Sequence, residues 1–263
     1  MAKAAWVTGG ASGIGAAVSR RLASQGYRVL VTDVDESGGS AVASEIGGLF
    51  KRCDVTSPSD SLDAVAAATE AFGGLDLAFL NAGVATGFAL EEGFSPEAYR
   101  RVMSINLDGV VYGAHAALPA LKARGGGDIV ATASLAGLTA VPFDPIYGAN
   151  KAAVVGLVRA LGPLYTADNI RVNALCPSFA ETAIITNVRD ALIGAGVPLL
   201  DVADVVAAFD SILAGDGTGE AWYVQVGRPA EPFAFRNVPG PRTPAGDKAP
   251  SADASVQTSL GEA

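Results

Sequence analysis

The sequence holds a single histidine, His115, and only two cysteines, Cys53 and Cys176, among its 263 residues. The cysteines are far apart and lie in no metal-ligand spacing, so no metal site is predicted. His115 falls within a long helical stretch and is expected to be a structural side chain, which leaves a Ser-His-Asp hydrolase with little support. Cys176 is expected to be a small core residue.

Positive charge and long apolar runs are also scarce. The 18 Lys and Arg residues stand against 27 Asp and Glu residues, a formal net charge of −9. Neither nucleic acid nor an anionic membrane surface is therefore expected as a partner. No apolar run reaches membrane-spanning length, and Met1–Thr8 runs straight into a strand-like segment without the layout of a signal peptide. We expect a cytoplasmic protein with reduced thiols.

What the sequence does have is a regular alternation of short apolar runs and longer helical patterns. The alternation is typical of βαβ units, and nearly continuous apolar strands indicate a parallel sheet covered on both faces. We predict an α/β fold with a three-layer, doubly wound parallel sheet in a single domain. Strands are predicted at Ala4–Thr8, Arg28–Asp33, Leu49–Asp54, Leu75–Asn81, Asp128–Ser134, Ile170–Cys176 and Ala221–Val226. Helices are predicted at Ile14–Gln25, Ser37–Glu45, Ser59–Phe72, Pro96–Leu121, Tyr147–Leu164 and Val202–Ala214.

The alternation of strand-like and helical segments ends after about Gly227. Residues 237–263 are mostly small or polar and include no aromatic residue. We therefore expect a nucleotide-binding catalytic domain over residues 1–236, followed by a flexible tail over residues 237–263 that could still fold against a partner.

A glycine-rich segment, Thr8–Gly15, follows the first predicted strand and opens a helix. Its spacing is Gly-x3-Gly-x-Gly rather than the commoner Gly-x-Gly-x-x-Gly. Glycines let the backbone approach a pyrophosphate, and the helix N-terminus favours the negative charge. A glycine-rich turn alone also serves ordinary tight turns, but the strand–turn–helix context favours dinucleotide binding.

Polar residues end the next strands. Asp33 can accept hydrogen bonds from an adenosine ribose and repels a 2′-phosphate, and no Lys or Arg occupies Val34, Ala11 or Ser12 to receive one. This selects NAD over NADP, although Asp33 could also cap a turn. Asp54 and Val55 could contact adenine, with a turn or helix-cap role for Asp54 nearly as well supported. The small residues of Asn81-Ala82-Gly83 permit a ligand, or equally a structural turn.

Tyr147 and Lys151 lie about one helical turn apart, so their side chains share a helix face. A free phenol is a poor base at neutral pH, and a neighbouring ammonium is expected to lower the Tyr147 pKa. Ser134, on the preceding strand, can donate a hydrogen bond to a substrate oxygen. An acid/base group beside a nucleotide site suits hydride transfer at an alcohol carbon.

Together with Asn106, these motifs resemble the short-chain dehydrogenase/reductase family over about residues 4–227. The resemblance implies a single-domain Rossmann fold with NAD or NADP. It implies Tyr147 as the acid/base, Lys151 on the nicotinamide ribose, Ser134 on the substrate oxygen, and Asn106 holding a water in a proton relay.

The resemblance also makes Pro177–Thr182 a loop in which Ala180 and Thr182 meet the nicotinamide carboxamide. Three positions depart from the family pattern: Leu80 replaces an Asn, Ser178 replaces a Gly, and Val226-Gly227-Arg228-Pro229 replaces a closing Asp-Gly-Gly. The expected NAD site is Gly9, Ser12, Gly13, Ile14, Gly15, Asp33, Asp54, Val55, Asn81, Ala82, Gly83, Tyr147, Lys151, Pro177, Ala180 and Thr182.

The substrate is expected to be a small apolar alcohol or ketone. The predicted lining carries no Arg or Lys to clamp a carboxylate or phosphate, which favours a hydrophobic secondary alcohol. The lining residues are Leu135, Leu138, Val141, Pro142, Phe143, Ala180, Ile184 and Ile185. Two alternatives remain: a catalytically silent NAD-binding regulator or scaffold, and an epimerase reusing the same tyrosine. The resemblance further implies a homodimer or homotetramer formed through the helices that hold Asn106 and Tyr147.

Overall fold

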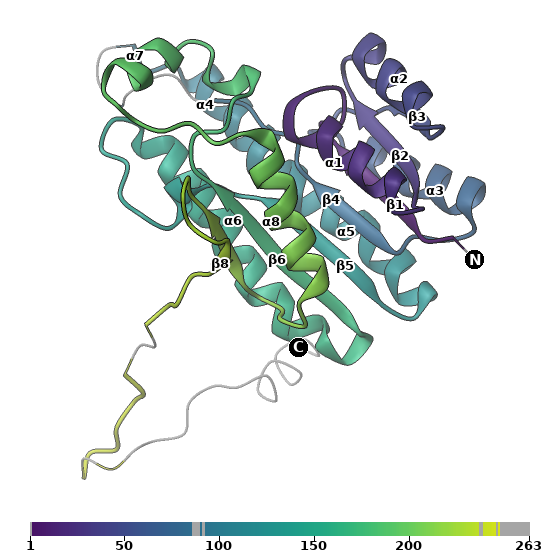
Figure 1. Cartoon of the computed structure of the whole chain (residues 1–263). Coiled ribbons are helices and arrows are strands. Elements are labelled where there is room, and N and C mark those ends of the chain that lie inside the picture. Colours follow the sequence, from purple (N-terminus) through teal and green to yellow (C-terminus); the bar gives the residue numbers. More distant parts are fainter. Residues whose placement is uncertain (1, 86–89, 91–92, 237–238, 246, 248–263) are drawn as a thin grey trace. The chain divides into compact units, whose positions relative to one another are not determined.

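The computed structural model describes residues 2–85, 90, 93–236, 239–245 and 247 (Figure 1). Residues Met1–Phe233 form one compact unit, and the chain from Ala234 onward forms a second. In that second unit Thr243 N–H donates to the Asp247 carbonyl at 2.8 Å. Most of the predicted tail over residues 237–263 lies outside the described residues.

The first unit is built on one sheet with strand order β3-β2-β1-β4-β5-β6-β7-β8. Neighbouring strands are parallel from β3 to β7, and β8 pairs antiparallel with β7. The order reverses between β1 and β4, which is where ligands bind in open sheets of this kind. The strands are β1 Ala4–Thr8, β2 Arg28–Asp33, β3 Leu49–Arg52, β4 Leu77–Leu80, β5 Gly127–Thr132, β6 Ile170–Pro177, β7 Ala221–Val224 and β8 Glu231–Pro232.

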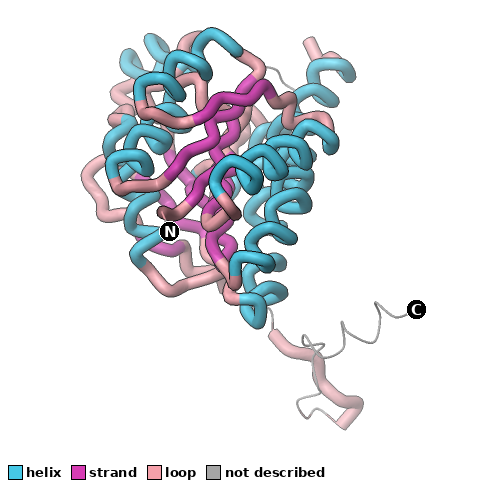
Figure 2. The backbone as a smooth tube through the Cα atoms, turned by 90° about the vertical axis from the view of Figure 1, so that its right-hand side faces the viewer, coloured by secondary structure: helices cyan, strands magenta, loops and turns pink. Residues whose placement is uncertain are grey.

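Helices cover both faces, so the sheet is the middle of three layers, as Figure 2 shows. Helices α1, α2 and α8 pack on one face, and α3, α5 and α6 on the other (Figure 1). The predicted three-layer parallel fold is confirmed. The helices are α1 Gly13–Ser24, α2 Glu36–Glu45, α3 Pro58–Phe72, α4 Pro96–Met103, α5 Gly109–Arg124, α6 Pro145–Tyr165, α7 Arg189–Gly194 and α8 Val202–Ala214.

Local chemistry sets the helix ends that matter for the site. Helix α3 begins at Pro58 after Ser57, whose hydroxyl accepts from Asp60 N–H, and it stops at Gly73 with φ of 81°. Helix α6 begins at Pro145 after Asp144, whose carboxylate accepts from Tyr147 N–H. Proline suits the first helical position because its missing N–H would have no intrahelical partner there. The Asp144 cap therefore fixes where Tyr147 enters the helix.

The prediction of one helix over Pro96–Leu121 was wrong. A π-helix, Ser104–Asp108, separates α4 from α5. Such widened turns are rare and are frequently found at functional sites, and Asn106 is fully buried in this one. The short elements α7 and β8 were not predicted.

Several strand ends also differ from the predictions. Strand β4 stops at Leu80 because the N–H groups of Asn81 and Ala82 donate to the Thr8 hydroxyl instead of the sheet. Strand β5 stops at Thr132, before Ser134 turns the chain into a short 3-10 helix. Strands β3 and β7 are two residues shorter than predicted at their carboxyl ends.

Trp6 lies at the centre of the sheet and is fully buried. Its indole N–H donates to the Thr32 hydroxyl on β2 at 2.9 Å, and that hydroxyl donates to the Val7 carbonyl at 3.0 Å. A buried indole needs such a partner. The arrangement joins the two strands that carry the glycine-rich turn and Asp33.

Replacing Trp6 with Phe should lower the free energy of unfolding by about 1–3 kcal/mol, because it leaves a cavity and removes the bond to Thr32. Urea denaturation measures the change. Trp222→Phe is the matched control, since Trp222 is only half-buried on β7 and donates to Glu220. Equal losses in the two variants would contradict the central role of Trp6.

Candidate active site

The glycine-rich turn leaves no room for side chains. Gly9 and Gly13 have φ of 63° and 51°, in the region that favours glycine. A Cβ on Gly9 would lie 2.8 Å from the Ala82 Cα, and one on Gly15 would lie 2.1 Å from the Gly9 carbonyl oxygen. Ser12 is the N-cap residue of α1, and Ile14 lies in its first turn. The backbone can therefore approach a pyrophosphate at a helix N-terminus.

Asp33 connects the end of β2 to this turn. One carboxylate oxygen accepts from Ala11 N–H at 3.0 Å, and the other accepts from Asp35 N–H at 3.0 Å. The structure thus holds a negative charge beside the glycine-rich turn, where an adenosine ribose would lie in a dinucleotide site. Both the ribose and the turn functions weighed for Asp33 fit this position.

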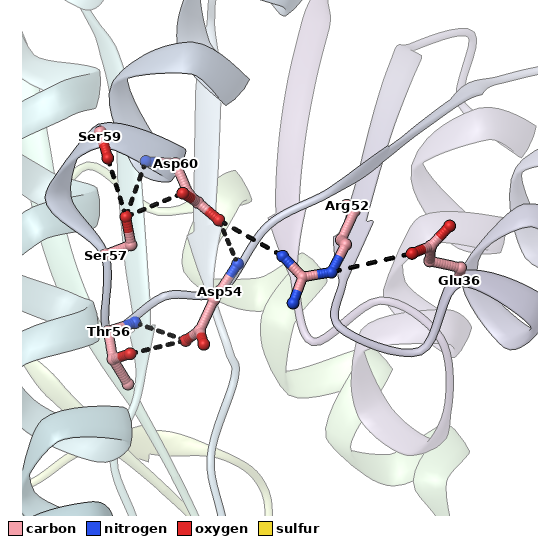
Figure 3. Close-up of polar contacts among 7 residues, drawn as sticks. All are labelled: Glu36, Arg52, Asp54, Thr56, Ser57, Ser59 and Asp60. Carbon is pink, nitrogen blue, oxygen red and sulfur yellow. Dashed lines mark hydrogen bonds and ion pairs between the residues drawn. The ribbon is translucent and has the colours of Figure 1, made fainter.

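Asp54 makes the contacts of a turn residue. One of its carboxylate oxygens accepts from the Thr56 N–H and hydroxyl at 3.0 and 2.8 Å (Figure 3). The Asp54 N–H donates to Asp60 at 2.9 Å. Val55 is buried, and a Cβ on Gly109 would come within 2.9 Å of it. These contacts match the turn reading of Asp54, and adenine contact stays a prediction.

Asn81 links the carboxyl ends of three strands. Its amide N–H groups donate to the Thr8 and Gly9 carbonyls at 3.3 Å, and its amide oxygen accepts from the Thr132 hydroxyl at 3.0 Å. The Thr8 hydroxyl in turn accepts from the N–H groups of Asn81 and Ala82. Sequence reasoning singled out Asn81 and missed Thr132, because only the strand pairing brings Thr132 beside it.

Asn106 points inward from the π-helix. Its amide oxygen accepts from Val84 N–H at 2.8 Å, and its amide N–H donates to the Val84 carbonyl at 2.9 Å. The side chain thus holds the segment after β4, and the predicted water relay stays a prediction. A Cβ on Gly83 would lie 3.3 Å from the Asn106 oxygen and 3.8 Å from Lys151 Nζ. Gly83 therefore lies between these two side chains.

Lys151 is almost completely buried, at 3% exposure. Its Nζ donates to the Thr132 carbonyl at 2.9 Å. Burial lowers the pKa of the Lys151 ammonium to about 8, with Cys176 acting weakly in the opposite direction. Cys176 is buried, as expected of a core residue, and burial raises its pKa to about 12.

Tyr147 is half-buried on the first turn of α6, and its ring centroid lies 5.8 Å from Lys151 Nζ. Burial raises the pKa of the phenol, a hydrogen bond with Ser134 lowers it, and Asp144 raises it further. This direction corrects the prediction that Lys151 lowers the Tyr147 pKa. The reason is that Lys151 directs its ammonium to Thr132, while desolvation disfavours the phenolate.

The predicted loop after β6 meets the other parts of the site. The Ser134 hydroxyl donates to the Pro177 carbonyl at 3.4 Å, and a Cβ on Gly13 would lie 3.3 Å from the Thr182 methyl group. Ala180 is buried and pairs with Leu200. The loop predicted to meet the nicotinamide and the glycine-rich turn are therefore neighbours.

The predicted pocket residues differ in exposure. Ala180 and Ile185 are buried, whereas Phe143 is 72% exposed. Among the described residues, no group of three or more His, Cys, Asp or Glu side chains is placed to hold a metal ion. No helix in the described ranges is long and apolar enough to cross a membrane.

Residues 3–192 match the family model described as short chain dehydrogenase. The chain is 38% identical over 194 residues to a cyclohexanol dehydrogenase of Acinetobacter sp. (strain SE19), across 72% of this chain and 77% of that protein. It is 40% identical over 188 residues to a 2,5-dichloro-2,5-cyclohexadiene-1,4-diol dehydrogenase of Sphingobium indicum, across 70% of this chain and 75% of the relative.

Among solved structures, a 3-ketoacyl-(acyl-carrier-protein) reductase from Brucella melitensis complexed with NADH superimposes with a TM-score of 0.79. It is 31% identical in sequence, and the match covers 86% of this chain and 98% of that one. The chain therefore belongs to the short-chain dehydrogenase/reductase family, whose members are oxidoreductases that use NAD or NADP.

Replacing Lys151 with Met should raise the free energy of unfolding at pH 7 by about 1–2 kcal/mol, because the variant no longer buries a charge. The folded pKa of about 8 lies below the ordinary value of 10.5. The unfolded chain thus binds the extra proton between these values, and wild-type stability rises with pH there. The advantage of the variant should shrink across that window, as urea denaturation at several pH values would measure.

Lys122→Met is the control, and it should change the free energy of unfolding in the opposite direction. Lys122 is exposed and pairs with Asp168 at 2.7 Å, which raises the Lys122 pKa. Its loss should lower stability at pH 7. If the difference in the free energy of unfolding between Lys151→Met and wild type did not depend on pH, that result would contradict a buried charge at Lys151.

Proposed function

We propose that the protein is an NAD-dependent oxidoreductase that interconverts a hydrophobic cyclic secondary alcohol and its ketone. One observation carries the proposal: the Tyr147 ring centroid lies 5.8 Å from the Nζ of the buried Lys151, which donates to the Thr132 carbonyl just before Ser134. Ser134 follows β5, Tyr147 lies in the first turn of α6, and the Ser134 hydroxyl donates to the Pro177 carbonyl at the end of β6. The loop after β6 is close to the glycine-rich turn, since a Cβ on Gly13 would lie 3.3 Å from the Thr182 methyl group. This arrangement supports an acid/base role for Tyr147 beside a turn that would hold a pyrophosphate.

The choice of NAD rests on the glycine-rich turn and on Asp33. The turn would hold the pyrophosphate, and the Asp33 carboxylate would accept from ribose hydroxyls and repel a 2′-phosphate. When bound, NAD supplies a hydride acceptor at its nicotinamide ring. The NADH complex of the Brucella reductase supports this cofactor.

The substrate class rests on the apolar lining and on the relatives. None of the eight predicted lining residues is charged. Three relatives are named for cyclic alcohols: a cyclohexanol dehydrogenase, a dichlorocyclohexadienediol dehydrogenase and a cis-4-hydroxycyclohexanecarboxylate dehydrogenase. A six-membered ring bearing a secondary alcohol is the substrate that these observations share.

The hydroxyl groups of Ser134 and Tyr147 would carry out the proton transfer. Ser134 donates to the substrate oxygen, and Tyr147 exchanges a proton with it. The raised Tyr147 pKa keeps the phenol protonated near neutral pH, so it is ready to protonate a ketone oxygen. Alcohol oxidation needs the phenolate and should therefore be faster at higher pH. Lys151, with a pKa of about 8, is suited to exchange the proton onward.

A homodimer or homotetramer formed through α5 and α6 stays a prediction, as does a cytoplasmic location. Both helices leave a large apolar side chain in solvent, Val111 at 40% and Leu164 at 54% exposure. These side chains are available to a second copy of the chain.

Tyr147→Phe should reduce turnover about 10²–10⁴-fold, because it removes the proton that meets the substrate oxygen. NAD binding should change little, since the ring remains. Oxidation of cyclohexanol, followed by NADH absorbance, measures turnover, and isothermal titration calorimetry measures NAD affinity. Tyr165→Phe, at the other end of α6, is the matched control and should keep wild-type turnover.

Near-wild-type turnover in Tyr147→Phe would contradict the acid/base assignment. A wild-type preference for the charged 3-hydroxybutyrate over cyclohexanol would contradict the substrate class. Binding of NAD without turnover of any alcohol or ketone would favour the silent regulator instead.

A further inference from the structure

A cation stands beside Asp33 that sequence reasoning did not consider. Arg52 ends β3, in register with Asp33 on β2, and Cys53 N–H donates to the Asp33 carbonyl at 3.1 Å. Residues paired in register on neighbouring strands present their side chains to the same face of a sheet. Arg52 thus lies one strand away from the carboxylate that faces the adenosine ribose.

Two carboxylates flank the Arg52 guanidinium. Its Nε lies 3.8 Å from a Glu36 oxygen at the start of α2, and a terminal nitrogen lies 3.8 Å from an Asp60 oxygen in the first turn of α3 (Figure 3). Both helices begin at the carboxyl edge of the sheet. The guanidinium is therefore held at the edge where the nucleotide binds.

The two ion pairs differ in how firmly they are anchored. Asp60 also accepts from Asp54 N–H and from the Ser57 hydroxyl, and these bonds lower its pKa. Glu36 is 69% exposed. Arg52 is itself 53% exposed, so each pair contributes little stability and can be exchanged for another anion.

We propose that Arg52 is a latent phosphate-binding residue, and that Glu36 and Asp60 help to set the preference for NAD by neutralising it. A guanidinium receives a phosphate through two parallel N–H bonds. Here its charge is already balanced by two carboxylates, and Asp33 adds a third negative charge in the same neighbourhood. The preference thus comes from the charge balance of four side chains rather than from Asp33 alone. The inference rests on the proposed dinucleotide site.

The test compares adenosine 2′,5′-bisphosphate with AMP, two probes that differ only in the 2′-phosphate, by isothermal titration calorimetry. The double variant Asp33→Asn/Glu36→Gln removes two negative charges while keeping side-chain size. Relative to AMP, it should bind the bisphosphate at least about tenfold more tightly than wild type does. Adding Arg52→Met should abolish that gain. Adding Arg52→Lys should keep part of it, because lysine retains the positive charge but cannot form the two parallel N–H bonds of a guanidinium.

Lys51→Met in the same double variant is the matched control. Lys51 lies on the same strand and carries the same charge, but it precedes Arg52 by one residue, and successive residues of a strand present their side chains to opposite faces. The gain should survive this change. A gain that survives Arg52→Met, or that is lost equally with Lys51→Met, overturns the proposal. AMP affinity is the reference for each variant, because Asp33→Asn also removes an acceptor for the ribose hydroxyls, and the added Arg52 or Lys51 changes should alter it by no more than about twofold. Failure of AMP to bind the wild type would instead overturn the nucleotide site itself.

Discussion

The hydrogen bond from Lys151 Nζ to the Thr132 carbonyl is the contact on which the site depends. Thr132 ends β5, and its hydroxyl donates to Asn81 at the end of β4. Asn81 then donates to the carbonyls of Thr8 and Gly9, where β1 enters the glycine-rich turn. One polar chain thus runs across the carboxyl ends of three strands and joins the Lys151 ammonium to the glycine-rich turn.

Burying that ammonium is unfavourable, and the fold compensates for it. Burial lowers the pKa of Lys151 to about 8, and the apolar sheet with the helices packed on it supplies the compensating stability. A lysine with this pKa can gain or lose a proton near neutral pH. In the proposed mechanism, this buried lysine exchanges a proton during the reaction.

Much of the fold could be predicted from the sequence, because strands β1 and β2 and helix α8 have clear apolar patterns and polar ends. The spacing of Tyr147 and Lys151 likewise predicted that the two side chains lie close together, which the structure confirms, while their catalytic roles stay a proposal. The π-helix could not be predicted, since it depends on Asn106 meeting Val84, which is distant in sequence. The direction of the Tyr147 pKa shift was also missed, because spacing along a helix gives proximity but says nothing about desolvation or where an ammonium points. The position of Arg52 next to Asp33 could be recognised only from the pairing of β2 with β3.

The most direct test is to titrate the Lys151 side chain by NMR in the wild-type protein labelled at lysine, with Lys151→Met used to assign its signal. A pKa of about 8 is expected for Lys151, against the ordinary value of 10.5. A Lys151 that titrates at its ordinary value would show that its ammonium is solvated, which would contradict the buried ammonium at the centre of this account.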